Sequence, residues 1–202
     1  ISNPNFKNSD KDLNLSIEST STDRMSTFGY KSSKSGFSIG TNFEYLDDLR
    51  LGLSNKSYIE EITVDSTASS KQKKQEGNYF DSFIGLDFNY DKRNQRFQTT
   101  SGFYSNYSLE LPVLSETNTI TNSYRYKIFK ELYENNVSTF SLLLQSSNSL
   151  TGDDIKLSER LYIPGKRLRG FERGKVGPKD QDDFIGGNYI TTINATSTVP
   201  RI

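Results

Sequence analysis

The sequence predicts an all-β protein in which antiparallel strands follow one another up and down. Three observations predict this class. Apolar and polar residues alternate with period two in many short segments, and this spacing is typical of half-buried strands. Aromatic residues that favour strands are abundant, with 12 Tyr and 13 Phe against a single Met. The connections between the alternating segments are short at one end and longer at the other.

The alternation predicts about eight strands. In the first segment Leu13, Leu15 and Ile17 fall on one face, while Asn14 and Ser16 fall on the other. Segments near 43–53 and 126–133 also fit a helical period, but glycines in the first and an Asn-Asn turn after the second favour strands. Clear alternation covers 13–18, 37–45, 49–54, 80–90, 103–111 and 139–145, and weaker alternation covers 119–133 and 187–199.

The connections indicate how the strands are arranged. Tight turns are predicted at 46–48, 91–101 and 134–136, and looser connections at 20–26, 58–78, 112–118 and 148–186. Short turns at one end and long loops at the other are the layout of an outer-membrane β-barrel. A soluble β-sandwich gives the same alternation and stays open as the alternative. Aromatic residues near the strand ends favour the barrel, in which the lipid face would carry Leu86, Phe88, Leu142 and Leu144.

Composition excludes several classes of function. The chain has 25 basic and 25 acidic residues, so no overall charge favours nucleic acid. It has no Cys and no His, which removes Ser-His-Asp and Cys-His catalysis and the usual transition-metal ligands. No apolar run is long enough for a membrane helix, and no signal peptide is recognisable. An enzyme here would need carboxylates or lysines alone. The way the chain starts and stops suggests a piece of a longer protein. We expect no metal site, because the adjacent carboxylates of Asp182 and Asp183 are too few ligands for calcium.

A glycine-rich basic stretch interrupts the alternation. It reads RLYIPGKRLRGF over 160–171, followed by VGPK at 176–179 and GGN at 186–188. The order of these elements, within one long connection, resembles the outer-membrane insertase (bacterial surface antigen) superfamily of which BamA is a member. The residues that carry the resemblance are Leu168, Arg169, Gly170 and Phe171, with Gly177, Pro178, Gly186, Gly187 and Asn188 in support.

The resemblance implies a sixteen-stranded barrel in which residues 1–202 form a partial transmembrane barrel domain, strands five to twelve. It also implies that the loop of about 148–186 folds back into the barrel lumen, where Leu168–Phe171 would pack. Arg169 would then bind acidic residues of the wall, Gly170 would allow a tight turn and Phe171 would pack the tip. An acidic residue common on the twelfth strand of the family corresponds to Thr196 here.

The resemblance further implies a function. The protein would be a non-enzymatic insertase that folds β-barrel proteins into the bacterial outer membrane without a nucleotide or cofactor. Its partners would be the outer-membrane lipid bilayer, assembly-machine lipoproteins and unfolded barrel clients, and not nucleic acid. The alternatives are a secretion pore or a translocation and assembly module of the same superfamily that exports a partner protein. An outer-membrane lipid hydrolase and a porin are further alternatives. The hydrolase needs a base that this histidine-free segment does not supply, and a porin does not need the loop motif.

Overall fold

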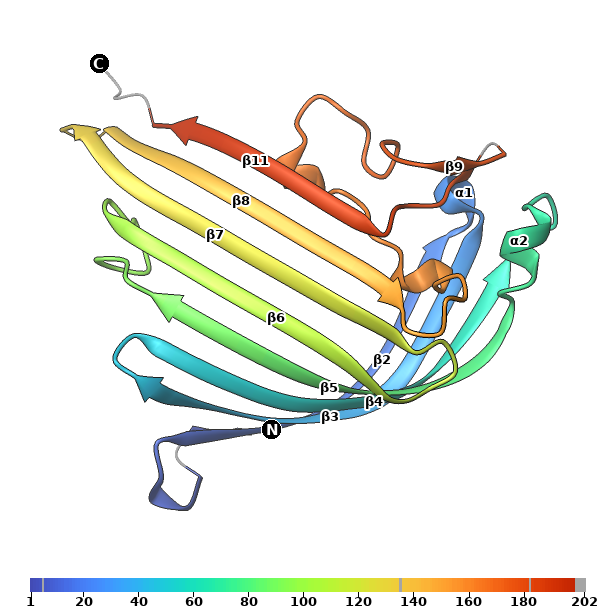
Figure 1. Cartoon of the computed structure of the whole chain (residues 1–202), viewed down its shortest axis with the longest axis horizontal. Coiled ribbons are helices and arrows are strands. Elements are labelled where there is room, and N and C mark those ends of the chain that lie inside the picture. Colours follow the sequence, from blue (N-terminus) through green and yellow to red (C-terminus); the bar gives the residue numbers. More distant parts are fainter. Residues whose placement is uncertain (5, 135, 182, 199–202) are drawn as a thin grey trace.

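A computed structural model describes residues 1–4, 6–134, 136–181 and 183–198, most of which form one curved antiparallel sheet (Figure 1). Nine strands follow in the order β1-β2-β3-β4-β5-β6-β7-β8-β11. The sheet is an open trough with β1 and β2 towards one edge and β11 at the other (Figure 1). The strands are β1 (Ser2–Asn3), β2 (Lys11–Arg24), β3 (Tyr30–Leu46), β4 (Leu49–Val64), β5 (Gly77–Asp91), β6 (Gly102–Ser115), β7 (Thr119–Tyr133), β8 (Asn136–Ser149) and β11 (Tyr189–Ser197).

This architecture confirms the predicted all-β, up-and-down class. The eight predicted strands are β2 to β8 and β11, and the two segments with helical spacing lie in strands and a turn. In the described ranges, the second sheet is the ribbon of β9 (Lys179–Asp180) and β10 (Asp183–Phe184), so no sandwich forms. The remaining elements are α1 (Met25–Phe28), α2 (Ser70–Lys73) and three-residue 3-10 turns at Phe6–Asn8, Leu157–Glu159 and Gly165–Arg167.

The strand register separates two chemically different faces. Leu53 pairs with Leu86, and Leu142 pairs with Ile193, so these side chains share the outward, convex face. Phe88 and Leu144 also lie on this face, as expected. The opposite, concave face carries polar pairs such as Ser16 with Ser38, whose hydroxyls lie 2.7 Å apart. An apolar exterior around a polar interior is the pattern of a transmembrane barrel wall. No helix among the described residues has the length and apolar character needed to cross a membrane.

Three of the predicted loose connections are shorter than expected. Strand β2 continues to Arg24, β4 to Val64 and β6 to Ser115, so the connection predicted at 112–118 is a three-residue turn at 116–118. The predicted loops at 20–26 and 58–78 were likewise wrong in their first residues. In β2 and β3 the apolar alternation ends here because both faces of the extended strands are polar, yet the ladder continues. The added parts of β4 and β6 still carry apolar residues such as Ile59, Ile62 and Leu114. Cross-strand hydroxyl pairs join Ser19 to Ser35 at 2.9 Å and Ser21 to Ser33 at 3.2 Å.

The turns at the other end agree with the prediction. Residues 47–48 join β3 to β4, and a compact turn at 92–101 joins β5 to β6. Arg93 donates two hydrogen bonds of 2.7 Å to the carboxylate of Asp91, which fixes the start of this turn. Asn135 in the predicted turn 134–136 and Val199 in the predicted strand 187–199 lie outside the described residues.

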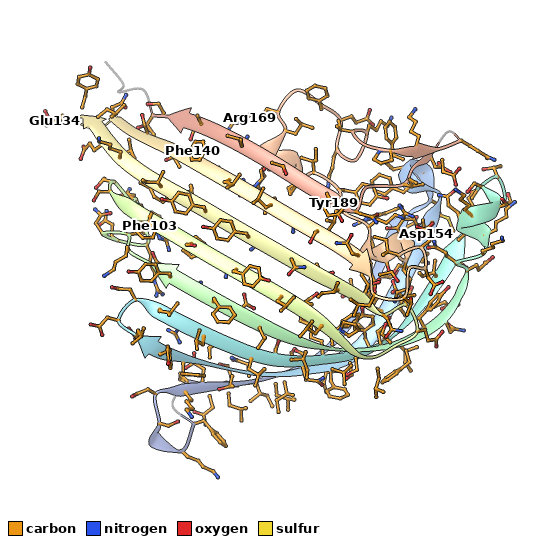
Figure 2. The ribbon with its side chains drawn as sticks, viewed as in Figure 1. Phe103, Glu134, Phe140, Asp154, Arg169 and Tyr189 are labelled. Atoms are coloured by element: carbon orange, nitrogen blue, oxygen red, sulfur yellow. The ribbon has the colours of Figure 1, made fainter. Side chains whose placement is uncertain are left out.

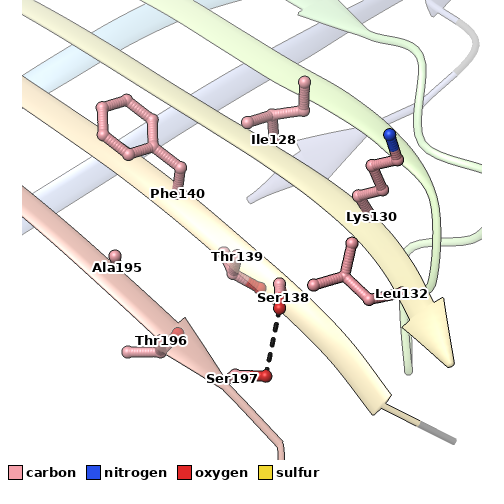
Figure 3. Close-up of a pocket in the computed structure, with 9 residues that line it drawn as sticks. All are labelled: Ile128, Lys130, Leu132, Ser138, Thr139, Phe140, Ala195, Thr196 and Ser197. Carbon is pink, nitrogen blue, oxygen red and sulfur yellow. Dashed lines mark hydrogen bonds between the residues drawn. The ribbon is translucent and has the colours of Figure 1, made fainter.

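An apolar hollow near the ends of β7, β8 and β11 lies mainly on the convex face (Figure 3). Phe140 pairs with both Ile128 and Ala195, and the hydroxyl of Ser138 donates to that of Ser197 at 3.0 Å. Because these residues share the face that carries Leu142 and Leu144, the hollow belongs to the apolar exterior. We therefore place the candidate functional site on the other side of the sheet.

Candidate functional site

The long connection between β8 and β11, residues 150–188, forms the candidate functional site. It lies at the same end of the sheet as α1 and α2 (Figure 1). Its side chains and backbone bind inward-facing residues of several strands, as the contacts below establish. We call this segment the long loop.

An aromatic cluster packs the long loop against the start of β3. Phe28, Tyr30 and Leu157 are buried together, and the rings of Phe28 and Tyr162 stack with centroids 4.2 Å apart. The guanidinium of Arg24 lies over both of these rings, at 5.4 Å and 5.6 Å. Burial raises the pKa of Tyr162, so its hydroxyl stays neutral and donates to the carbonyl of Phe184 at 3.2 Å.

Two glycines allow the loop backbone to approach this cluster. Gly174 is buried with φ +80°, and a Cβ there would overlap the ring of Phe28. Gly186 has φ +72°, and a Cβ there would lie 2.8 Å from the carbonyl oxygen of Leu161 and 2.9 Å from the ring of Tyr162. Both sites therefore need glycine for its left-handed backbone and for its lack of a side chain.

The predicted tetrapeptide lies at the exposed part of the loop. Gly170 has φ +83°, in agreement with a tight turn. Phe171 is 63% exposed and adjoins Leu168 and Val176 around a small cavity. Arg169 is exposed, and it makes no hydrogen bond or ion pair with a residue that the structure describes (Figure 2). Its expected acidic partner is thus not part of the described wall.

Arg167, which the motif did not single out, makes a contact with β11. Its Nη1 lies 3.3 Å from Oγ1 of Thr192, and its carbonyl accepts a 2.8 Å hydrogen bond from Nδ2 of Asn194. Burial lowers the pKa of Arg167, and the positive charge of Arg125 lowers it further. The loop therefore meets β11 through two neutral side chains.

The supporting motif residues join the loop to itself and to β8. Leu161 and Gly187 exchange two backbone hydrogen bonds of 2.9 Å, and the amide of Ile185 donates to the carbonyl of Pro178 at 3.1 Å. The carbonyl of Asn188 accepts a 2.8 Å bond from the amide of Ser147 in β8. Gly177 adopts φ +136° next to Pro178. These bonds bring the separate G-P and G-G-N elements onto one folded unit.

A buried charge cluster at the root of the loop was missed by the sequence reasoning. Lys156 lies against Glu60 of β4 and Asp81 of β5, and all three are almost completely buried. These residues are 96 and 75 positions apart in the chain, so no local pattern could bring them together. Among the described residues, no group of His, Cys, Asp or Glu is suited to hold a metal ion. The arrangement can hold a loop in place, because its charges are paired with one another.

Comparisons with known proteins identify the family and the fold of the chain. Residues 1–201 match the family model described as the Omp85 superfamily domain. The structure is similar to the crystal structure of BamA from Haemophilus ducreyi lacking POTRA domains 1–3, with a TM-score of 0.79 and 20% identity. The likeness covers 96% of this chain and 42% of that one, so the chain spans less than half of the BamA structure. A comparison with curated proteins finds no match.

Proposed function

Because the chain belongs to the Omp85 superfamily, we propose that the whole protein folds and inserts β-barrel proteins into the bacterial outer membrane. The observation that carries the proposal is the combination of a barrel wall with an ordered loop on its concave face. The fold match to BamA over 96% of the chain supports it. The convex face is apolar along several strands, as a surface in contact with lipid would be.

The insertion mechanism we propose uses backbone pairing and no catalytic side chain. A strand at the edge of a sheet presents unpaired N–H and C=O groups, which can template the pairing of a client strand. In this chain the trough is open between its first and last strands (Figure 1), so we propose that further strands close it. The client strand would enter at a seam among those strands, and assembly lipoproteins would act on the whole protein.

The long loop would support this activity from inside the barrel. We propose that Leu168, Arg169, Gly170 and Phe171 face the lumen wall supplied by strands beyond β11. The exposure of Arg169 and Phe171 in this chain supports that placement, because both side chains are available for such contacts. A lumen is wet and polar, and it tolerates the positive charge of this segment where lipid would not.

Depletion of the full-length protein tests the proposal and separates it from the alternative. The amounts of several unrelated barrel proteins in the outer membrane are measured after depletion, with a plasmid copy of the wild-type gene as the control. We expect all of them to decrease together. If barrel proteins remain normal while one exported protein disappears, the protein is a secretion pore or a translocation and assembly module of the same superfamily.

A further inference from the structure

Lys156 crosses the concave face of the sheet. It lies shortly after the end of β8, yet its Nζ lies 3.2 Å from Oε2 of Glu60 and bonds to Oδ2 of Asp81. Strands β6 and β7 separate β8 from β5 in the sheet. The Lys156 side chain is 1% exposed and both carboxylates are 0% exposed. This contact therefore holds the root of the long loop against the far part of the wall.

The two carboxylates have further hydrogen-bond donors. Ser32 and Ser158 donate to Glu60, the second at 2.9 Å, and Ser115 donates to Asp81 at 2.6 Å. A buried charge network is favourable only when its remaining polar atoms are satisfied. The donors around Glu60 and Asp81 meet that condition for these two carboxylates, with one of them, Ser158, coming from the loop itself. Oε1 of Glu159 has the ion pair with Lys156 but no hydrogen-bond donor among the described residues.

The chain around Lys156 is the most buried part of the loop. Ile155, Lys156 and Leu157 are between 1% and 2% exposed. The amide of Leu157 donates to Oε1 of Gln75 at 2.8 Å, and its carbonyl accepts from the hydroxyl of Tyr30 at 3.1 Å. The ring centroids of Tyr58 and Tyr79 lie 5.9 Å and 5.1 Å from Nζ of Lys156 and form cation–π contacts with it.

The charges around Lys156 are nearly balanced. Lys34 lies 3.5 Å from Glu60, and Glu159 lies 3.4 Å from Lys156. Burial by itself lowers the pKa of Lys156, but the carboxylates of Glu159, Asp81 and Glu60 raise it more, so the ammonium stays charged. Burial raises the pKa of Glu159. The titratable groups that face this cluster are Tyr30 and Lys34 from β3, Tyr58 and Glu60 from β4, Tyr79 and Asp81 from β5, Glu116 from the turn after β6, and Glu159 from the loop.

We propose that Lys156 is the electrostatic anchor of the long loop, a positioning residue that joins the loop root to β4 and β5 through Glu60 and Asp81. This anchor is separate from the tetrapeptide 168–171, which lies farther along the loop. The proposal goes beyond the proposed function, because it concerns contacts within this chain. It does not depend on whether the barrel inserts client proteins or exports a partner protein.

Hydrogen–deuterium exchange of the purified full-length protein tests the anchor. In Lys156→Met, Asp81 is left buried without a counter-charge and Glu60 keeps only Lys34, so residues 155–162 should exchange at least about tenfold faster than in the wild type at pH 7.5. The triple variant Lys156→Met, Glu60→Gln, Asp81→Asn removes the charges of these three residues, leaves Lys34 and Glu159 in the cluster, and should regain much of the slow exchange. Lys175→Met, which removes an exposed lysine paired with Glu172 in the same loop, is the matched control and should exchange as the wild type.

A pH series distinguishes charge from packing. Acid protonates the uncompensated carboxylates, so the difference between Lys156→Met and wild type should shrink as the pH falls from 7.5 to 5, after correction for intrinsic exchange. Wild-type exchange in Lys156→Met, or fast exchange in both this variant and the triple variant at every pH, would overturn the proposal. If Lys156→Met does not fold, folding of the triple variant supports the anchor and failure of both overturns it.

Discussion

Gly174 lies directly against the ring of Phe28, so closely that no side chain fits between them. Phe28 ends α1 near the start of the chain, whereas Gly174 lies in the basic part of the long loop, 146 residues later. This single contact joins the hairpin of β2 and β3 to the loop that follows β8. It makes the position of the loop sensitive to the smallest possible change in side chain.

Gly174→Ala should therefore loosen the loop. The added methyl group overlaps the Phe28 ring, and overpacking of this kind costs about 1–3 kcal/mol. Gly152→Ala is the matched control, because Gly152 has a similar φ of +84° and nothing within 4 Å of its Cβ position. Trypsin cleavage between 165 and 180 of the full-length protein should be faster in the first variant than in the second. Equal cleavage in the two variants would mean that only backbone strain matters.

Leu142→Arg should destabilise the barrel in a bilayer. Leu142 lies on the convex face, opposite Tyr126 and Ile193, and an arginine near the membrane midplane costs about 2–4 kcal/mol. Thr139→Arg is the control, because Thr139 faces the concave side with Phe129 and Thr196. Urea unfolding in lipid vesicles measures both. A neutral Leu142→Arg would remove this position from the lipid-facing band.

Arg169→Ala should weaken the attachment of the loop to the rest of the closed barrel. Charge-assisted hydrogen bonds of a guanidinium are worth about 1.5–3 kcal/mol each. Arg169→Lys keeps the charge without the planar fork and should restore the wild-type behaviour only in part. Arg173→Ala removes another exposed arginine of the same loop and serves as the control. The readouts are the heat resistance of the folded band in gels and the amount of barrel protein in the outer membrane. If neither changes, Arg169 does not hold the loop, and the motif must act through Phe171 and the glycines.

The heat resistance of the full-length protein should depend on the charge of Glu159. Burial raises the pKa of Glu159, so the stability it contributes is complete below its ordinary pKa of 4.5 and is lost as the pH rises through the raised value. Glu159→Gln copies the protonated form and should resist heating better than the wild type at pH 8, with a difference that vanishes near pH 4.5. The opposite order at pH 8 would show that Glu159 is ionised and favourably paired.

The strands could be predicted from the sequence because their signal is local. Side chains alternate between the two faces of any strand, so Leu13, Leu15 and Ile17 fall on one face wherever that strand lies in the sheet. The ends of β2 and β3 could not be predicted in this way, since residues 19–23 and their partners 31–35 are polar on both faces beyond the apolar band. There the backbone ladder continues without leaving any trace in the hydropathy pattern.

The loop contacts show a similar division. The order of the motif elements placed them in one long loop, and only the structure shows that backbone bonds of Gly187 and Asn188 join that loop to itself and to β8. The contacts of Lys156 with Glu60 and Asp81, and of Gly174 with Phe28, depend on residues that are far apart in the chain. Each of these residues, considered alone, has the appearance of an ordinary polar strand or loop residue, so only the fold identifies its role.

Reconstitution of the full-length protein, together with the lipoproteins that purify with it, tests the central claim most directly. A urea-unfolded outer-membrane barrel protein is added to liposomes that contain this assembly, and its folding is followed by the shift of its unheated band in gels. We predict faster folding than in empty liposomes, and slower folding when the assembly carries Lys156→Met or Arg169→Ala. Folding at the rate of empty liposomes with the wild-type assembly would contradict the claim that this protein inserts barrels.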